Sequence, residues 1–180
     1  MSRAGVLVAG VLVCLLALGA ATGAAGEPAA DREAVKAAIE QTIGWAIEKD
    51  FEAMFRLWGD DLFHFWLTSD SQVVGIENFK TYAESWRDPE FRGTRFEFRD
   101  LRIVFSASGD VAWYSCYLDD CGTYRGKESC TENVFQTGVL EKRDGRWVHV
   151  LMHGSYPIDK VPEKYLRRFY PDLCDAEGRE

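Results

Sequence analysis

The pattern that decides the fold lies in residues 110–155, DVAWYSCYLDDCGTYRGKESCTENVFQTGVLEKRDGRWVHVLMHGS. Residues Val111 to Leu118 alternate and are rich in aromatic and β-branched side chains, which predicts a strand. After a loop that contains Cys and Gly, a strand pattern resumes from Thr131 to Lys142. Asp144-Gly145 favours a type I′ turn, because both central residues of that turn need positive φ. Arg146 to Ser155 then return as the last strand, so two successive antiparallel hairpins are predicted.

The N-terminal residues have the features of a secretory signal peptide. Arg3 supplies a positive charge, an apolar run extends from Gly5 to Leu18, and small residues from Ala20 to Gly26 offer cleavage sites. We therefore predict a signal peptide over residues 1–26 and a secreted or periplasmic protein with no membrane attachment after cleavage. The alternative is an uncleaved signal that anchors the protein in a membrane.

The composition predicts one acidic domain. The 180-residue chain has a formal net charge of −8 and a pI of about 5.0. Nucleic acid requires a basic face, and the only basic cluster is Lys164 to Arg168, so we predict no nucleic-acid partner. We predict a single domain over residues 27–157 and a C-terminal extension over residues 158–180 that contains a short helix.

Four cysteines follow the predicted signal peptide, at positions 116, 121, 130 and 174. An even number of cysteines in an exported protein suggests disulfides, and four cysteines allow three connectivities. We prefer a bond between Cys121 and Cys130, because both flank the loop of one hairpin. The alternative for Cys116 is a free, buried thiol that behaves as a small hydrophobic side chain.

The residues before this stretch predict three helices and further strands. The spacing of apolar residues indicates helices from Asp31 to about Lys49, from Asp50 to Gly59, and over residues 76–87. Strands are expected over residues 62–67 and, with a bulge near Asp100, from Thr94 to Phe105. The predicted class is α+β: a cone in which three helices of the N-terminal half pack on a strongly bent, mostly antiparallel sheet.

At the level of motifs, the sequence resembles the SnoaL-like branch of the nuclear transport factor 2-like superfamily, over about residues 31–157. The motifs that carry the resemblance are Lys49 to Met54, Gly59 to Asp61, Gly75 to Phe79, Gly109 to Trp113, and Thr137 to Trp147 continuing to His153-Gly154-Ser155. The resemblance implies a conical pocket and a homodimer formed through the sheet. It implies no single chemistry, because the family includes isomerases, cyclases, dehydratases, transport adaptors and binding modules.

The ketosteroid isomerases of this superfamily need a carboxylate base, a tyrosine hydroxyl and a protonated carboxylic acid. At the matching positions this sequence has Trp66, Thr42 and Thr137. Indole cannot accept a proton at neutral pH, and neither threonine supplies the missing group. The resemblance therefore argues against isomerase chemistry of that type.

Strict alternation predicts an aromatic pocket lining. Trp113, Ser115 and Tyr117 share one face of their strand, and pairing across the Asp144-Gly145 turn places Thr137 and Met152 on that face. Trp66 and Trp86 are expected to join them. Such a lining suits a small hydrophobic or aromatic ligand. The alternative is that these side chains simply fill the cone.

Two residues are candidates for a general acid or base. His64 could face the pocket, although a hydrogen-bonded core histidine is the alternative. Asp119, next to Asp120, could be an acid of raised pKa, although both could be solvated turn residues. His149 and His153 are expected on the outer face, too far apart on a strand for one ion. We predict neither a metal nor a cofactor.

Two functions of different class remain open. The first, which we favour, is an exported, non-catalytic domain that binds a small apolar ligand or supports a dimer. The second is a SnoaL-like cyclase, isomerase or hydrolase that uses His64 or Asp119 as its general acid or base. The absence of a carboxylate at Trp66 favours the first.

Overall fold

The computed structural model of the chain describes residues 29–67 and 72–157, apart from the side chains of residues 66 and 67. In chain order its elements are α1 (Ala29–Glu48), α2 (Phe51–Phe55), β1 (Trp58–Leu67), β2 (Gln72–Val74), α3 (Ile76–Ala83), the short 3-10 helix η1 (Glu84–Arg87), β3 (Phe91–Phe105), β4 (Val111–Tyr124), β5 (Lys127–Arg143) and β6 (Arg146–Ser155). The predicted signal peptide and the C-terminal extension lie outside the described residues.

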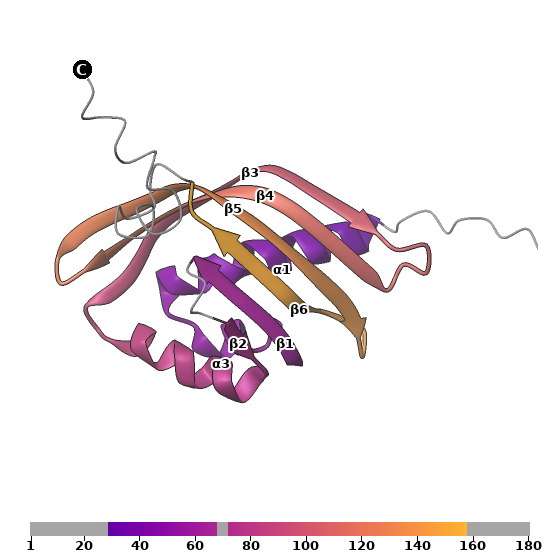
Figure 1. The fold of residues 1–180 in the computed structure, drawn as a ribbon, viewed down its shortest axis with the longest axis horizontal. Helices are drawn as coiled ribbons and strands as arrows, with labels where there is room; N and C mark the ends of the chain where they lie inside the picture. Colours follow the sequence, from indigo (N-terminus) through magenta and orange to yellow (C-terminus); the bar gives the residue numbers. More distant parts are fainter. Residues whose placement is uncertain (1–28, 68–71, 158–180) are drawn as a thin grey trace, which may run out of the picture.

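The strands form one bent sheet of order β2-β1-β6-β5-β4-β3. All neighbours are antiparallel except β1 and β6, which run parallel. The sheet curves over α1 and α3, which lie on its inner side (Figure 1). This arrangement confirms the predicted α+β cone. Within residues 29–67 and 72–157, no helix is long and apolar enough to cross a membrane.

Local sequence signals explain several of these elements. The Asp50 carboxylate accepts a hydrogen bond from the Ala53 N–H at 2.9 Å and caps α2, as predicted. Asp144 and Gly145 have φ values of 50° and 76°, which the β5–β6 turn requires. Asp100 has a φ of 53° where the pairing of β3 and β4 shifts, which confirms the predicted bulge.

Two of the predicted boundaries were wrong. Asp31 lies within α1, which begins by Ala29, and its carboxylate instead bonds to Lys142 and to the Trp147 indole on the sheet. The second helix ends at Phe55, because Trp58 already pairs with His149 at the start of β1. In both cases contacts with the distant β5–β6 hairpin replace the local pattern.

The core joins α1 to the inner face of the sheet. Val35 and Ile39 of α1 pack with Tyr114, and the whole cluster comprises Val35, Ala38, Ile39, Ile103, Ala112, Tyr114, Cys116, Leu140 and Trp147. Gly138 makes this packing possible: a Cβ there would lie 2.5 Å from the Tyr114 ring and 2.8 Å from the Leu151 carbonyl oxygen. A larger residue at position 138 would therefore displace Tyr114.

The prediction that Trp113, Ser115 and Tyr117 of β4 face the pocket was wrong. Ala112, Tyr114 and Cys116 are buried in the core with α1, and Leu118 is buried on the same face. Trp113 and Tyr117 are 45% and 42% exposed on the outer face. Ser115 alternates with them and lies on the same outer face. Both sets contain large apolar side chains, so alternation separates the two faces without showing which one packs on helices that are distant in sequence.

A bulge in β6 explains why two further predictions were wrong: that His149 lies on the outer face and that Thr137 faces the pocket. In the β5–β6 pairing, Val139 lies opposite Leu151 and Leu140 lies opposite His149, so one residue of β6 is left over. His149 and Met152 therefore both face inward, although strict alternation separates them. Thr137 pairs with His153 rather than with Met152, which places Thr137 on the outer face with Ser115.

Candidate functional site

A cavity of about 220 Å³ lies between the helices and the inner face of the sheet. Its walls come from α1, α3, η1 and the strands that curve over them (Figure 1). The lining residues are Thr42, Ile43, Trp45, Ala46, Trp58, His64, Phe79, Trp86, Phe91, Asp120, Thr131, Met152 and Tyr156. Aromatic rings make up much of this wall, and polar side chains such as His64 and Asp120 lie among them, which is typical of a pocket for a small organic ligand.

The aromatic rings of the wall form one continuous cluster. The Trp45 and Trp86 rings lie 5.3 Å apart, and Trp86 lies 6.0 Å from Phe79. Phe79 in turn lies 4.8 Å from Trp58, and Trp45 lies 6.5 Å from Phe91. Trp45, Trp58 and Phe79 are almost completely buried. Their contacts fix the rings in place, so the cavity is formed before any ligand arrives.

His64 is the imidazole of this cavity. It pairs with Met152 across β1 and β6, and its ring lies 5.0 Å from Phe79 and 5.6 Å from Trp58. Burial lowers the pKa of His64 to about 4. The ring is therefore neutral near pH 7 and can exchange hydrogen bonds without carrying a charge.

Asp120 is the carboxylate of the cavity. It lies two residues after the inward-facing Leu118, next to a shift in the pairing of β4 and β5. Burial raises its pKa to about 6. Among the described residues it has no hydrogen-bonding or ionic partner for its side chain.

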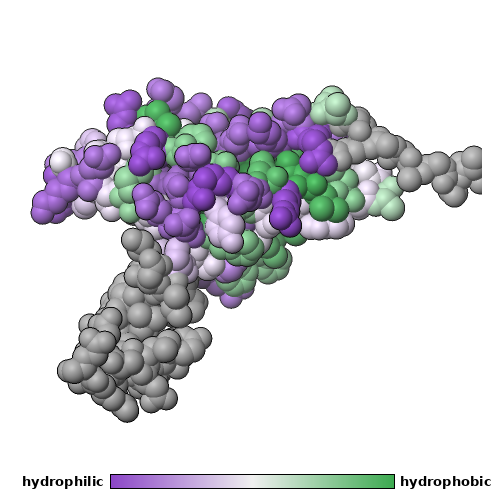
Figure 2. Space-filling view, turned by 90° about the horizontal axis from the view of Figure 1, so that it is seen from above, coloured by the Kyte–Doolittle hydropathy of each residue, from purple (hydrophilic) through white to green (hydrophobic). Residues whose placement is uncertain are grey.

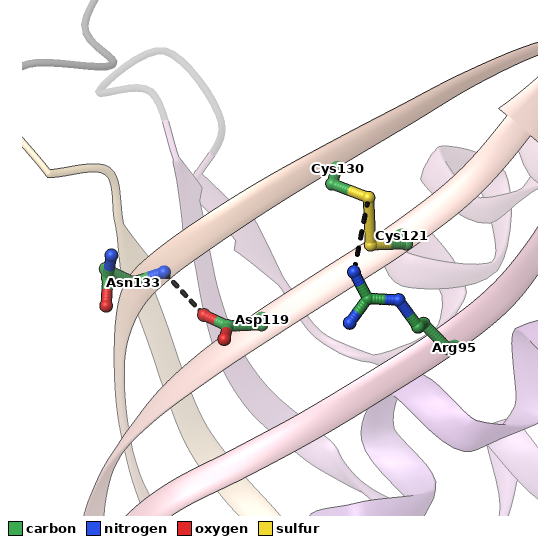
Figure 3. Close-up of a disulfide and its surroundings, with 5 residues drawn as sticks. All are labelled: Arg95, Asp119, Cys121, Cys130 and Asn133. Atoms are coloured by element: carbon green, nitrogen blue, oxygen red, sulfur yellow. Dashed lines mark hydrogen bonds between the residues drawn. A yellow bond between two sulfur atoms is a disulfide. The ribbon is translucent and has the colours of Figure 1, made fainter.

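Asp119 was predicted as a candidate general acid or base of the pocket. This prediction was wrong, because Asp119 lies outside the cavity. Its carboxylate accepts a hydrogen bond from the Arg99 guanidinium at 3.0 Å. It accepts a second from the Asn133 N–H at 2.7 Å (Figure 3). These contacts hold the pKa of Asp119 below its ordinary value. The ion pair between Asp119 and Arg99 links β3 to the β4–β5 hairpin and has a structural role. The carboxylate that lines the cavity is the next residue, Asp120.

The disulfide between Cys121 and Cys130 confirms the preferred pairing. The two residues lie directly opposite each other on β4 and β5, with Cα atoms 4.1 Å apart. The Arg95 guanidinium approaches the Cys130 Sγ at 3.9 Å (Figure 3). The bond follows Asp120 directly, so it restrains the part of the hairpin that carries this carboxylate. Cys116 is buried with a free thiol, as the alternative expected.

A second cavity of about 190 Å³ adjoins the first. Ala46, Phe91, Asp120 and Thr131 line both, so Asp120 lies at the boundary between them. Among the described residues, no lysine or arginine lines either cavity.

Behind the cavity lies a polar cluster that the sequence did not reveal. The Gln136 amide donates to the Tyr114 hydroxyl at 2.8 Å and lies 3.4 Å from the Thr42 hydroxyl. His149 packs between Tyr114 and Trp58, with ring distances of 5.8 and 5.1 Å. Burial lowers the pKa of His149 to about 3, against the effect of the nearby Leu57 carbonyl.

Several polar atoms of this cluster have no hydrogen-bond partner among the described residues. They are the Trp58 Nε1, the Gln136 Oε1 and both ring nitrogens of His149. Buried polar atoms normally have partners, so this end of the core is suited to ordered water or to a polar group of a ligand.

The predicted site residues therefore divide into two groups. His64, Trp86 and Met152 line the cavity, whereas Asp119 and the group Trp113, Ser115, Tyr117 and Thr137 do not. The Trp66 backbone pairs with Gly154, and its side chain lies outside the description. Prediction missed Trp45, Trp58, Phe79, Phe91 and Asp120 as pocket residues. Trp58 and Phe79 belong to apolar stripes of the predicted helices, but a stripe does not distinguish a cavity wall from a filled core.

No group of three or more His, Cys, Asp or Glu side chains converges as metal ligands within the described parts of the chain. Among the described residues that line the cavity of about 220 Å³, His64 and Asp120 are the two whose pKa values burial shifts, and it shifts them in opposite directions. What the cavity can do chemically therefore depends on an imidazole, a carboxylate and an aromatic wall.

A bent sheet that closes over helices around an interior cavity defines the class of the nuclear transport factor 2-like cone. The profile of the SnoaL-like domain matches residues 35–159, and the chain belongs to this family. No curated protein is significantly similar to the chain in sequence.

Solved structures share the fold at low sequence identity. A proposed scytalone dehydratase from Novosphingobium aromaticivorans is 15% identical with a TM-score of 0.64, over 72% of this chain and 85% of the other. An NTF2-like protein of unknown function from Pseudomonas putida is 19% identical with a TM-score of 0.61, over 76% and 93%. A hexachlorocyclohexane dehydrochlorinase is 18% identical with a TM-score of 0.60, over 71% and 85%. These similarities establish the fold alone.

Proposed function

We propose that this protein is an exported, non-catalytic SnoaL-like domain that binds a small, largely apolar ligand in the cavity. The observation that carries the proposal is the continuous aromatic wall of Trp45, Trp58, Phe79 and Trp86 around a cavity of about 220 Å³. Such a wall binds flat or compact organic groups by burial of apolar area and by ring contacts.

The positions of the catalytic groups support a binding role over isomerase chemistry. Thr42 lines the cavity where the isomerases have a tyrosine, and Thr137 lies on the outer face of the sheet. His64, with its pKa of about 4, is a weak base near pH 7. Neither threonine nor His64 therefore supplies the base that the isomerases use.

A second candidate is an acid–base enzyme that uses Asp120 and His64. The observation that favours it is that both side chains line one cavity and that burial moves their pKa values in opposite directions. Because their pKa values are shifted in opposite directions, Asp120 could act as the base and the neutral His64 as a hydrogen-bond donor. Conversion of a bound compound, abolished in Asp120→Asn, would establish this candidate in place of the first.

The ligand-binding proposal is tested by a pair of tryptophan variants of the full chain. Trp86→Ala removes a ring of the cavity wall and should weaken the uptake of a hydrophobic dye, and of any small aromatic ligand that displaces it, by about tenfold. Trp113→Ala removes an equally large ring from the outer face and should leave uptake unchanged. Equal losses in both variants, or no uptake by the parent protein, would contradict the proposal.

The proposal includes a homodimer through the outer face of the sheet, since domains of this superfamily often form dimers. Val104, Trp113, Tyr117 and Phe135 are each between 41% and 46% exposed on β3, β4 and β5. Figure 2 shows hydrophobic patches that interrupt the hydrophilic surface of the molecule. A contiguous exposed apolar patch is typical of an interaction surface. Sedimentation should show a dimer, and Trp113→Arg should sediment as a monomer.

Export is proposed from the N-terminal sequence alone. Arg3, the apolar run and the small residues up to Gly26 support a cleaved signal. The mass of the protein recovered from the medium or periplasm of its source cells should correspond to a chain that begins near residue 27. A full-length protein in the membrane fraction would favour the uncleaved anchor.

A further inference from the structure

We propose that the ligand of the cavity carries a positive charge, as an amine or a quaternary ammonium group, which Asp120 and the aromatic wall bind together. This inference rests on the proposed binding function and specifies its ligand class. It depends on three observations: the carboxylate, the aromatic rings that line the same cavity, and the absence of a lysine or arginine among the described lining residues.

The first observation is that the Asp120 carboxylate has no partner within the described part of the chain. It lines both adjoining cavities, and the described residues provide its side chain with no hydrogen bond and no ion pair. Burial of an ionised carboxylate is unfavourable unless an opposite charge compensates it. Asp119, one residue earlier, has that compensation from Arg99. The raised pKa of Asp120 is consistent with the lack of it.

The second observation is the aromatic surface of the cavity that this carboxylate lines. Trp45, Trp58, Phe79, Trp86 and Phe91 line the same cavity. The faces of aromatic rings attract cations, tryptophan most strongly, and the attraction increases in a site without water. A neutral ligand would use the apolar area of these rings but would leave Asp120 uncompensated.

The third observation concerns the cations that lie nearby. Lys49 lies 5.9 Å over the Phe91 ring but donates to the Asp88 carbonyl, and Arg87 lies 4.3 Å over the Phe51 ring but pairs with Glu84. Neither side chain lines the cavity. These two cations therefore lie beside the aromatic cluster, while the carboxylate lines the cavity. The net charge of −8 also favours the approach of a cation.

The experiment compares two probes of nearly identical shape, phenyltrimethylammonium and its neutral isostere tert-butylbenzene. Affinities for the full chain are measured by ligand-observed NMR near pH 8, where Asp120 is ionised. We expect the parent protein to bind the cation about tenfold more tightly than the isostere.

Three variants test how this preference arises. Asp120→Asn keeps the shape of the side chain and should weaken binding of the cation about tenfold. Binding of the isostere should be unchanged, so the preference should be abolished. Phe91→Leu keeps an apolar side chain and should weaken binding of the cation more than binding of the isostere. Asp119→Asn, the matched control on the outer face, should leave both affinities unchanged.

Each outcome is decisive. Loss of the preference in Asp120→Asn, with both affinities unchanged in Asp119→Asn, supports the inference. Equal binding of the two probes by the parent protein, or an unchanged preference in Asp120→Asn, overturns the inference and leaves the binding function intact. If neither probe binds and no hydrophobic dye is taken up, the cavity is not a ligand site, and the inference falls together with the proposed function.

Discussion

Asp119 and Asp120 are neighbours on β4, yet the two faces of the sheet place them in opposite environments. On the outer face Asp119 accepts hydrogen bonds from Arg99 and Asn133, and its pKa is lowered. On the inner face Asp120 lines an aromatic cavity, and burial raises its pKa to about 6. The comparison shows that the chemistry of a side chain in this fold depends on the face of the strand and not on its position in the sequence.

The same comparison holds for the apolar residues of β4. Leu118 is completely buried on the inner face, whereas Tyr117, although larger, is 42% exposed on the outer face. Packing on the helices therefore stabilises the monomer through one face only, and the other face remains available for a partner. The four predictions below test this asymmetry, beginning with the largest effect.

The largest effect is expected from the core. Leu118→Ala should lower the free energy of unfolding by about 2–5 kcal/mol, because it leaves a cavity in a closed part of the core. Tyr117→Ala should cost less than about 1 kcal/mol in the monomer. Urea unfolding at low protein concentration measures both. A comparable loss in Tyr117→Ala would show that the outer face is buried too, as in a dimer that persists under these conditions.

The next effect is a loss of stability in acid. Burial lowers the pKa of His64 to about 4 and that of His149 to about 3. The unfolded chain binds these protons near pH 6.5, so the contribution of each histidine to stability is complete above that pH and is lost as the pH falls towards the folded values. The raised pKa of Asp120 acts in the opposite sense: its contribution is present below about pH 4 and is lost as the pH rises through about 6.

On unfolding between about pH 6 and pH 4, the two histidines take up about two protons and Asp120 releases about one. The free energy of unfolding should therefore fall by on the order of 1 kcal/mol per pH unit over this range. Asp120→Asn should make this decrease steeper, because it removes the opposing group. The free energy of unfolding measured by urea over this range tests both statements. An unchanged slope in Asp120→Asn would mean that Asp120 titrates at the same pH in the folded and unfolded states.

A smaller effect is expected from the polar cluster behind the cavity. Tyr114→Phe removes the acceptor of the Gln136 amide at 2.8 Å and should lower the free energy of unfolding by about 1–2 kcal/mol. Tyr117→Phe, which removes a hydroxyl from the outer face, should change it by less than about 0.5 kcal/mol. Thermal unfolding of the two variants provides the comparison. A neutral Tyr114→Phe would indicate that water already satisfies the Gln136 amide.

The smallest effects concern the two aspartates, and they should differ in sign near pH 7. Asp120→Asn replaces an uncompensated carboxylate by an amide that also lacks a partner among the described residues, so the gain is largely offset and the melting temperature should rise only slightly. Asp119→Asn weakens the partly exposed pair with Arg99 and should lower it slightly. Differential scanning calorimetry resolves the two. A decrease in both variants would mean that the Asp120 carboxylate has a stabilising partner in solution.

Sequence patterns predicted the elements of the fold well where the signal is local. The Asp144-Gly145 turn, the Asp50 cap, the bulge near Asp100 and the Cys121–Cys130 disulfide all follow from short-range stereochemistry. The motifs from Lys49 to Ser155 were sufficient for the SnoaL-like family, which the profile match confirms. The same signals could not predict the start of β1 at Trp58, because that strand is defined by its pairing with β6.

The sequence by itself determined the fold class, the family and the disulfide, and it indicated His64, Trp86 and Met152 as cavity residues. Only the tertiary structure decided which face of β4 is the inner one, and the bulge in β6 decided that His149 and Met152 point the same way. The physical reason is that alternation has a period of two and is symmetric between faces, so the choice depends on helices packed from a distant part of the chain. That choice places Asp120 in the cavity and Asp119 outside it.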